Sequence, residues 1–145
     1  MHWQRTFLHP MLANFDAPSR EDALCTRTIA NTPQQALTLL NDPAFVEAAR
    51  VFAARLLSAR GSDTERLERA FQQALARPTK PKEKVSLLAF LDKARAAYRA
   101  RPDDAKALLT VGNAPKPTLG DPVELAAWTS VCRVVLNLQE TITRY

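Results

Sequence analysis

The stretch Asn31-Thr32-Pro33-Gln34-Gln35-Ala36-Leu37-Thr38-Leu39-Leu40-Asn41-Asp42-Pro43-Ala44-Phe45 contains two helix starts a few residues apart. Thr32 is a typical N-cap, followed by a proline and by Gln35 at the capping-box position. Asp42 repeats the cap-plus-proline pattern. Neither proline costs a helical hydrogen bond, because the first N–H groups of a helix have no partner within it. The stretch therefore predicts a short helix, a corner and a long helix.

Similar signals recur on both sides of this stretch. Ser62 and Glu65 form a second capping-box pair, and Asp121 precedes a proline with Glu124 at the capping-box position. Apolar side chains recur at helical spacing, and no stretch alternates as a strand would. We expect an all-α domain of about six helices, bundle-like or orthogonal. These helices lie near residues 33–40, 43–59, 62–76, 81–100, 102–112 and 121–143. A further helical segment is expected near residues 20–29, where several β-branched residues disfavour a regular helix.

The apolar pattern also predicts which faces are buried. Residues 43–59 should bury a stripe that includes Phe45 and Leu56 and turn Arg50 outward. Phe90 should lie on the buried face of the helix over residues 81–100. The last helix is apolar on most sides, so we expect it to be mostly buried, with Trp128 in the core.

Composition fits one soluble globular domain over residues 1–145. The chain is 46% hydrophobic and 24% charged, with ten prolines and only three glycines. Its net charge is +5, but Lys and Arg are spread over several helices. A nucleic-acid-binding domain usually carries a basic stripe, so nucleic acid is not an expected partner. No run of eighteen apolar residues predicts a membrane span, and the N-terminus does not lead into a signal-peptide core.

The residues that bind metals and form disulfides are few. Cys25 and Cys132 lie far apart in sequence and form no Cys-x-x-Cys motif. They could form one disulfide in an oxidising compartment, but we favour two buried free thiols because Cys132 lies within an apolar helix. His2 and His9 lack a cysteine nearby and do not have the spacing of a helical metal site. We therefore expect no metal and no other cofactor.

Two long groups of motifs resemble a known family. The motifs are Phe15-Asp16-Ala17-Pro18, Arg20-Glu21, Cys25, Arg27, Asn31-Thr32-Pro33, Gln35-Ala36-Leu37, Leu39-Leu40-Asn41, Pro43, Phe45, Asp121-Pro122, Glu124-Leu125-Ala126-Ala127-Trp128, Leu136-Asn137-Leu138, Glu140 and Ile142-Thr143-Arg144. They resemble the C-terminal domain of unknown function of large exported planctomycete proteins, which often also carry a haem c domain.

This resemblance runs from about residue 3 to residue 145. It implies a helical C-terminal piece of a multidomain protein in the periplasm or at the cell surface. It supplies no activity. The haem domain and the upstream part of the family's pattern are missing from this chain, so no redox role transfers to its residues.

The densest polar group within the resembling motifs consists of Asp16, Arg20, Glu21, Arg27 and Asn31. One interpretation is a ligand site for a sugar or an anion. The alternative is an ion-pair and capping network that fixes the entry to the helix after Thr32. Charged and polar side chains beside helix starts often serve as caps, so we favour the structural alternative.

The N-terminus is unusually apolar. Trp3, Phe7 and Leu8 lie close together in the sequence. Monomeric proteins seldom expose large apolar patches, and a symmetric dimer is a common way to cover one. We therefore predict a homodimer that buries these three side chains. The alternative is that the segment folds back over the domain itself.

These observations favour a non-catalytic interaction or scaffold module of a larger extracytoplasmic protein, whose other domains would be its partners. One alternative is a carbohydrate- or anion-binding domain that uses the group from Asp16 to Asn31. The other is part of an enzyme whose active site needs upstream sequence. We assign no catalytic residue within this chain.

Overall fold

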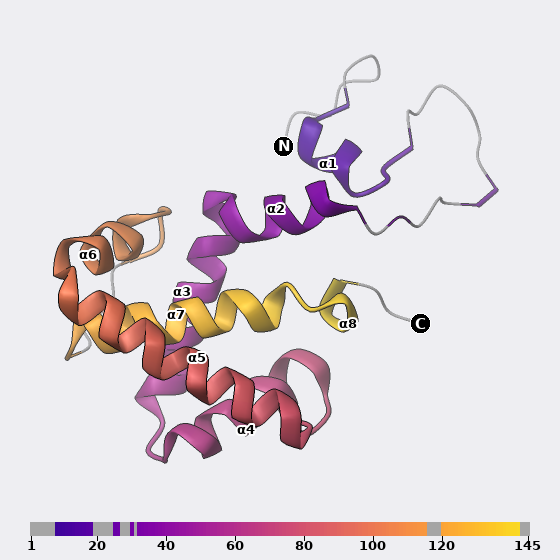
Figure 1. The fold of residues 1–145 in the computed structure, drawn as a ribbon. Helices are drawn as coiled ribbons and strands as arrows, with labels where there is room; N and C mark the ends of the chain where they lie inside the picture. The colour runs from indigo at the N-terminus through magenta and orange to yellow at the C-terminus, as the bar shows by residue number, and fades with distance from the viewer. Residues whose placement is uncertain (1–7, 19–24, 27–29, 31, 116–119, 143–145) are drawn as a thin grey trace. The chain divides into compact units, whose positions relative to one another are not determined.

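The computed structural model describes residues 8–18, 25–26, 30, 32–115 and 120–142 (Figure 1). The chain forms two compact units, residues 1–38 and residues 39–145. The expected helix over residues 20–29 falls almost entirely outside the described residues.

The described residues confirm the all-α prediction, and they contain no strand. The helices are α1 (Pro10–Asn14), α2 (Pro33–Asn41), α3 (Pro43–Ser58), α4 (Asp63–Leu75), α5 (Pro81–Ala100), α6 (Pro102–Thr110), α7 (Pro122–Leu136) and α8 (Gln139–Ile142).

The predicted starts of α3 and α4 are confirmed by their hydrogen bonds. Asp42 Oδ1 accepts from the backbone N–H of Ala44 at 2.9 Å. Ser62 and Glu65 form the reciprocal capping box of α4. Such caps satisfy N–H groups that have no partner within the helix, and each is worth about 1 kcal/mol. Local sequence therefore sets where these helices begin.

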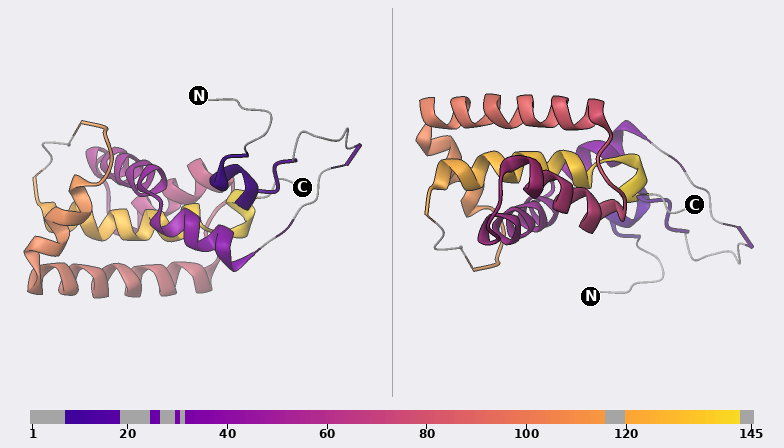
Figure 2. Two further views of the ribbon diagram at one scale, coloured as in Figure 1. Left: turned by 90° about the horizontal axis from the view of Figure 1, so that it is seen from above. Right: turned by 90° about the horizontal axis from the view of Figure 1, so that it is seen from below.

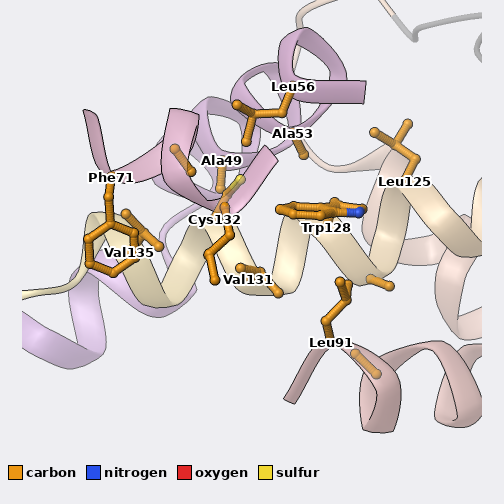
Figure 3. Close-up of a cluster of buried hydrophobic side chains, with 14 residues drawn as sticks. Ala49, Ala53, Leu56, Phe71, Leu91, Leu125, Trp128, Val131, Cys132 and Val135 are labelled. Carbon is orange, nitrogen blue, oxygen red and sulfur yellow. The ribbon is translucent and has the colours of Figure 1, made fainter. Parts of the chain in front are cut away.

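Helix α7 is the central helix of the larger unit. It packs against α3, α5 and α6, and it runs beside α5 in both views of Figure 2. Trp128 on α7 is fully buried, as expected. Small side chains at Ala49 and Ala53 let α3 approach the face of α7 that carries Cys132 (Figure 3). The predicted core helix is thus the one that the others surround.

The end of this helix differs from the prediction. α7 stops at Leu136, and a separate short helix follows from Gln139, whereas one continuous helix to about residue 143 was expected. The N–H of Asn137 is shared between the carbonyls of Arg133 and Val134, and the Thr141 hydroxyl donates to the Val135 carbonyl. Asn is a poor helix former, and the Thr141 side chain takes a carbonyl at the end of α7, which together favour the break.

Two predicted side-chain orientations are wrong. Arg50 was expected to face outward but is only 1% exposed. Phe90 was expected in the core but is 37% exposed. On α5 the core side is formed by Leu91 and Ala94, which leaves Phe90 at its margin. Helical spacing predicts which side of a helix is buried, but not how many side chains on that side the neighbouring helices will cover.

Candidate functional site

Only one member of the predicted polar group lies within the described residues. Asp16 has a left-handed backbone with φ 56°. Its Oδ2 accepts from the backbone N–H of Ala30 at 2.7 Å and from Gln35 Nε2 at 3.3 Å. Gln35 in turn completes the capping box with Thr32. The Asp16 carboxylate thus joins the turn after α1 to the start of α2, which fits the structural alternative.

The positions of most other predicted site residues are not described by the structure. Arg20, Glu21, Arg27 and Asn31 lie outside the described residues, as do Trp3 and Phe7. Leu8 is described and is half-buried. The proposed ligand site and the proposed N-terminal interface therefore remain predictions.

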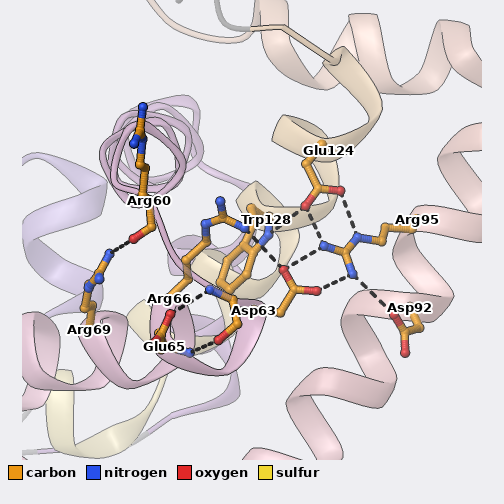
Figure 4. Close-up of polar contacts among 10 residues, drawn as sticks. Arg60, Asp63, Glu65, Arg66, Arg69, Asp92, Arg95, Glu124 and Trp128 are labelled. Atoms are coloured by element: carbon orange, nitrogen blue, oxygen red, sulfur yellow. Dashed lines mark hydrogen bonds and ion pairs between the residues drawn. The ribbon is translucent and has the colours of Figure 1, made fainter.

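A densely connected polar group among the described residues of the larger unit surrounds Arg95 on α5 (Figure 4). Its guanidinium donates to both carboxylate oxygens of Glu124 on α7, at 2.8 and 2.5 Å. It also donates to both oxygens of Asp63 on α4, at 2.7 and 2.9 Å. A fifth contact reaches Asp92 at 3.4 Å, so all five N–H groups have acceptors. Trp128 Nε1 donates to Glu124 as well.

This arrangement is structural in character. Hydrogen bonding to Arg95 is the main reason that the pKa of Asp63 is lowered, and burial opposes it. The pKa of Arg95 is raised by Glu124 and Asp63 in the same way. With every donor of the guanidinium occupied, the group fixes three helices together and offers no free donor to a ligand.

A second ion-pair group lies at the N-terminal end of α5, around Arg77. Arg77 donates to both oxygens of Glu83 at 2.9 and 2.8 Å, and to Glu140 on α8 at 2.6 and 3.1 Å. Its guanidinium carbon also lies 5.3 Å from the centre of the Phe71 ring. The hydrogen bonds from Arg77 are the main cause that lowers the pKa of Glu83 to about 2. This group therefore also has a structural role, since Arg77 joins α5 to α8.

The outward side of α3 is hollowed by two cavities. The larger, of about 530 Å³, lies between α3, α4 and the end of α7, and the smaller, of about 280 Å³, lies between α3 and the loop after α6. Val51 and Arg55 line both. We define the α3 face by the residues of α3 that line either cavity and are at least partly exposed: Ala44, Glu47, Ala48, Val51, Phe52, Ala54, Arg55 and Ser58.

Arg50 stands out beside this face. It lines the smaller cavity although it is almost fully buried. Its Nη1 donates to the Pro115 carbonyl at 3.2 Å and its Nη2 to the Ala114 carbonyl at 3.0 Å. Its Nε has no hydrogen-bond partner among the described residues. The ion pairs found between described residues do not include Arg50.

Sequence reasoning missed Arg50 because it treated the charge as a sign of exposure. A signal was present, since Arg50 follows Val46 by four residues and precedes Ala53 by three, and both of these are buried. An arginine at that spacing lies on the edge of the buried stripe. Whether the edge is covered depends on the loop around Ala114, which is distant in sequence.

The described residues contain no group of three or more His, Cys, Asp or Glu side chains placed to hold a metal ion. None of the described helices has the length and hydropathy needed to span a membrane.

Comparison with known proteins identifies a family but no function. The family model PSD1, described as a protein of unknown function (DUF1553), matches residues 1–91. The chain therefore belongs to this family. No curated protein matches the chain, and no solved structure matches it.

Proposed function

For this member of the DUF1553 family, we propose a non-catalytic interaction module that associates with a second copy of itself through the α3 face. The observation that carries the proposal is the arrangement of charge and side-chain size along α3. Glu47 and Arg55 are the charged residues of the α3 face, and they lie at equal distances in sequence on either side of Val51.

This spacing makes the face self-complementary. If two copies of α3 pack antiparallel with Val51 at the two-fold axis, Glu47 of one copy lies opposite Arg55 of the other. By the same symmetry, Ala48 lies opposite Ala54. Each favourable pair occurs twice in such an interface, as two-fold symmetry requires. The small alanine side chains would also allow the two helices to approach closely.

The local structure supports the two charges in these roles. Glu47 Oε2 accepts from the backbone N–H of Asn113, and this bond restrains the carboxylate. Arg55 is exposed and belongs to the last turn of α3, where its positive charge is favourable. The α3 face therefore carries a restrained carboxylate, Glu47, and an exposed guanidinium, Arg55. Such a pair suits an interface with a second copy that carries the same two charges.

A charge-swap experiment tests the proposal. The molar mass of the full chain should rise with concentration from 16.1 kDa toward twice that value in light scattering coupled to size exclusion. Arg55→Glu replaces two attractions with two repulsions. Since an exposed pair is worth about 0.2–1 kcal/mol, the dimer dissociation constant should increase roughly tenfold at low salt.

The double variant Glu47→Arg/Arg55→Glu restores opposite charges across the axis and should recover dimerisation. Arg99→Glu, on the exposed side of α5, serves as the matched control and should leave the constant unchanged. A strictly monomeric wild-type chain at high micromolar concentration would refute the proposal. Dimers that Arg55→Glu leaves intact but Trp3→Ala abolishes would instead favour the N-terminal interface of Trp3, Phe7 and Leu8.

We further propose that the module belongs to a larger extracytoplasmic protein of planctomycete type, in some members joined to a haem c domain. The resemblance of the motifs around Asn31 and Asp121 supports this proposal. The other domains of that protein would then be partners of this module. Sequencing the reading frame around this chain tests it, and a frame that encodes neither an export signal nor further domains would contradict it.

A further inference from the structure

We propose that the smaller cavity beside α3 binds a small oxyanion, with Arg50 and Arg55 as its cationic ligands. This site differs from the group around Asp16, and the inference does not depend on self-association through the α3 face. It starts from the charge of a buried guanidinium for which the described residues provide no counter-ion.

Burying an arginine is costly unless its charge and its donors are both satisfied. Arg95 illustrates the satisfied case, because all five of its N–H groups meet carboxylate oxygens. Arg50 is more deeply buried, at 1% exposed, yet its hydrogen bonds to the described residues are two, both to neutral carbonyls. A guanidinium has five N–H groups, so three donors of Arg50, the buried Nε–H among them, have no acceptor among the described residues, and its charge has no ion-pair partner there.

The cavity walls favour an anion. Arg55, which follows Arg50 by five residues on α3, contributes a second positive charge to the cavity wall. The other lining residues include the apolar side chains of Val51, Ala54 and Pro115. An apolar wall lowers the local dielectric constant and strengthens the attraction between a guanidinium and an anion. Ser58 also lines the cavity, but its hydroxyl donates to the Arg55 carbonyl.

No acidic side chain among the described residues forms an ion pair with Arg50. Glu47 lies one turn before Arg50, and its carboxylate is bonded to the N–H of Asn113. The cavity volume of about 280 Å³ is several times the roughly 30 Å³ that one water occupies, so an ion of phosphate or sulfate size fits with water to spare. Arginine binds such oxyanions in preference to halides because its donors match pairs of oxygens.

Nuclear magnetic resonance on the full chain can test this site directly. The Nε–H resonance of Arg50 is the reporter, and it is assigned by its loss in Arg50→Lys. Phosphate, sulfate and acetate are titrated separately at constant ionic strength, with chloride as the balancing ion. We expect a saturable shift of the Arg50 signal with at least one oxyanion and none with chloride. The acetate arm shows whether a carboxylate suffices or whether phosphate or sulfate is required.

Arg55→Gln removes the second charge from an exposed position and should weaken oxyanion binding about tenfold, the usual effect of losing one charge-assisted hydrogen bond. Arg99→Gln on α5 is the control and should bind as the wild type does. Repeating the titration at two protein concentrations separates oxyanion binding from any change in self-association. A shift that stays linear and equal for chloride and all three oxyanions would overturn the proposal, as would saturable binding that leaves Arg50 unshifted.

Discussion

Replacing Arg95 by methionine should destabilise the larger unit, because this one side chain joins three helices. The substitution keeps the length of the side chain and removes its charge and its donors. It leaves Asp63 and Glu124 facing each other without the cation between them. Trp128 Nε1 would then be the remaining side-chain donor to Glu124 among the described residues of this group.

The magnitude follows from the exposure of the three groups. The side chains of Arg95, Asp63 and Glu124 are 16%, 33% and 27% exposed, which is intermediate between a surface pair and a buried pair. Exposed pairs contribute about 0.2–1 kcal/mol, whereas breaking a fully buried pair costs about 3–5 kcal/mol. Two partly screened carboxylates therefore suggest a loss of about 2 kcal/mol in the free energy of unfolding.

Urea unfolding at pH 7, followed by circular dichroism, measures this loss. Arg99→Met is the matched control, since Arg99 lies one turn further along α5 and is exposed. It should change the free energy of unfolding by less than about 0.5 kcal/mol, as is usual for a surface substitution. If Arg95→Met and Arg99→Met were equally stable, the assigned role of this ion-pair group would be wrong.

The pH dependence offers a second check on Arg95. Arg95 lowers the pKa of Asp63 in the folded state below its ordinary value of 3.8. A carboxyl group with a depressed folded pKa stabilises the protein above the unfolded pKa, and this contribution is lost as pH falls through the folded pKa. The stability of the wild type should therefore fall below about pH 4, where unfolded carboxyl groups begin to bind protons. The Asp63 part of that fall should be smaller in Arg95→Met.

Three further predictions concern single residues. Asp121→Ala removes the cap that accepts from the Val123 N–H at 2.9 Å and should lower the free energy of unfolding by about 1 kcal/mol in the same urea assay. In the folded chain a thiol reagent should modify exposed Cys25 rapidly and Cys132 only on unfolding, because burial shields the Cys132 thiol and raises its pKa; two fast thiols would contradict this. The carboxyl group of Glu83 should titrate with a pKa of about 2, and Arg77→Met should move that pKa toward 4.5, as followed by carbon-13 chemical shifts.

Local sequence predicted the helix starts well. The caps at Asp42, Ser62 and Asp121 are each made by a side chain that bonds to an N–H two or three residues later. Nothing outside the segment is needed for such a bond, so the printed sequence contains the whole cause. The family resemblance likewise rests on contiguous motifs, and the match over residues 1–91 confirms a family of unknown function.

The candidate sites were harder to predict because their partners are distant in sequence. Arg95 meets Asp63 from 32 positions earlier and Glu124 from 29 positions later. Arg50 meets the carbonyls of Ala114 and Pro115 across more than sixty positions. A helical pattern shows which side of a helix an arginine occupies, but not which loop will cover it.

By itself, the sequence of this protein determined its all-α class, the capped starts of its helices and the apolar character of the helix that became its central one. These features depend on hydrogen bonds within a turn and on the period of the helix, which are local properties. Only the tertiary structure decided that every N–H group of Arg95 has an acceptor and that the buried Arg50 has donors without acceptors among the described residues. Burial and counter-ions come from segments brought together by packing, and no local pattern encodes which segments those will be.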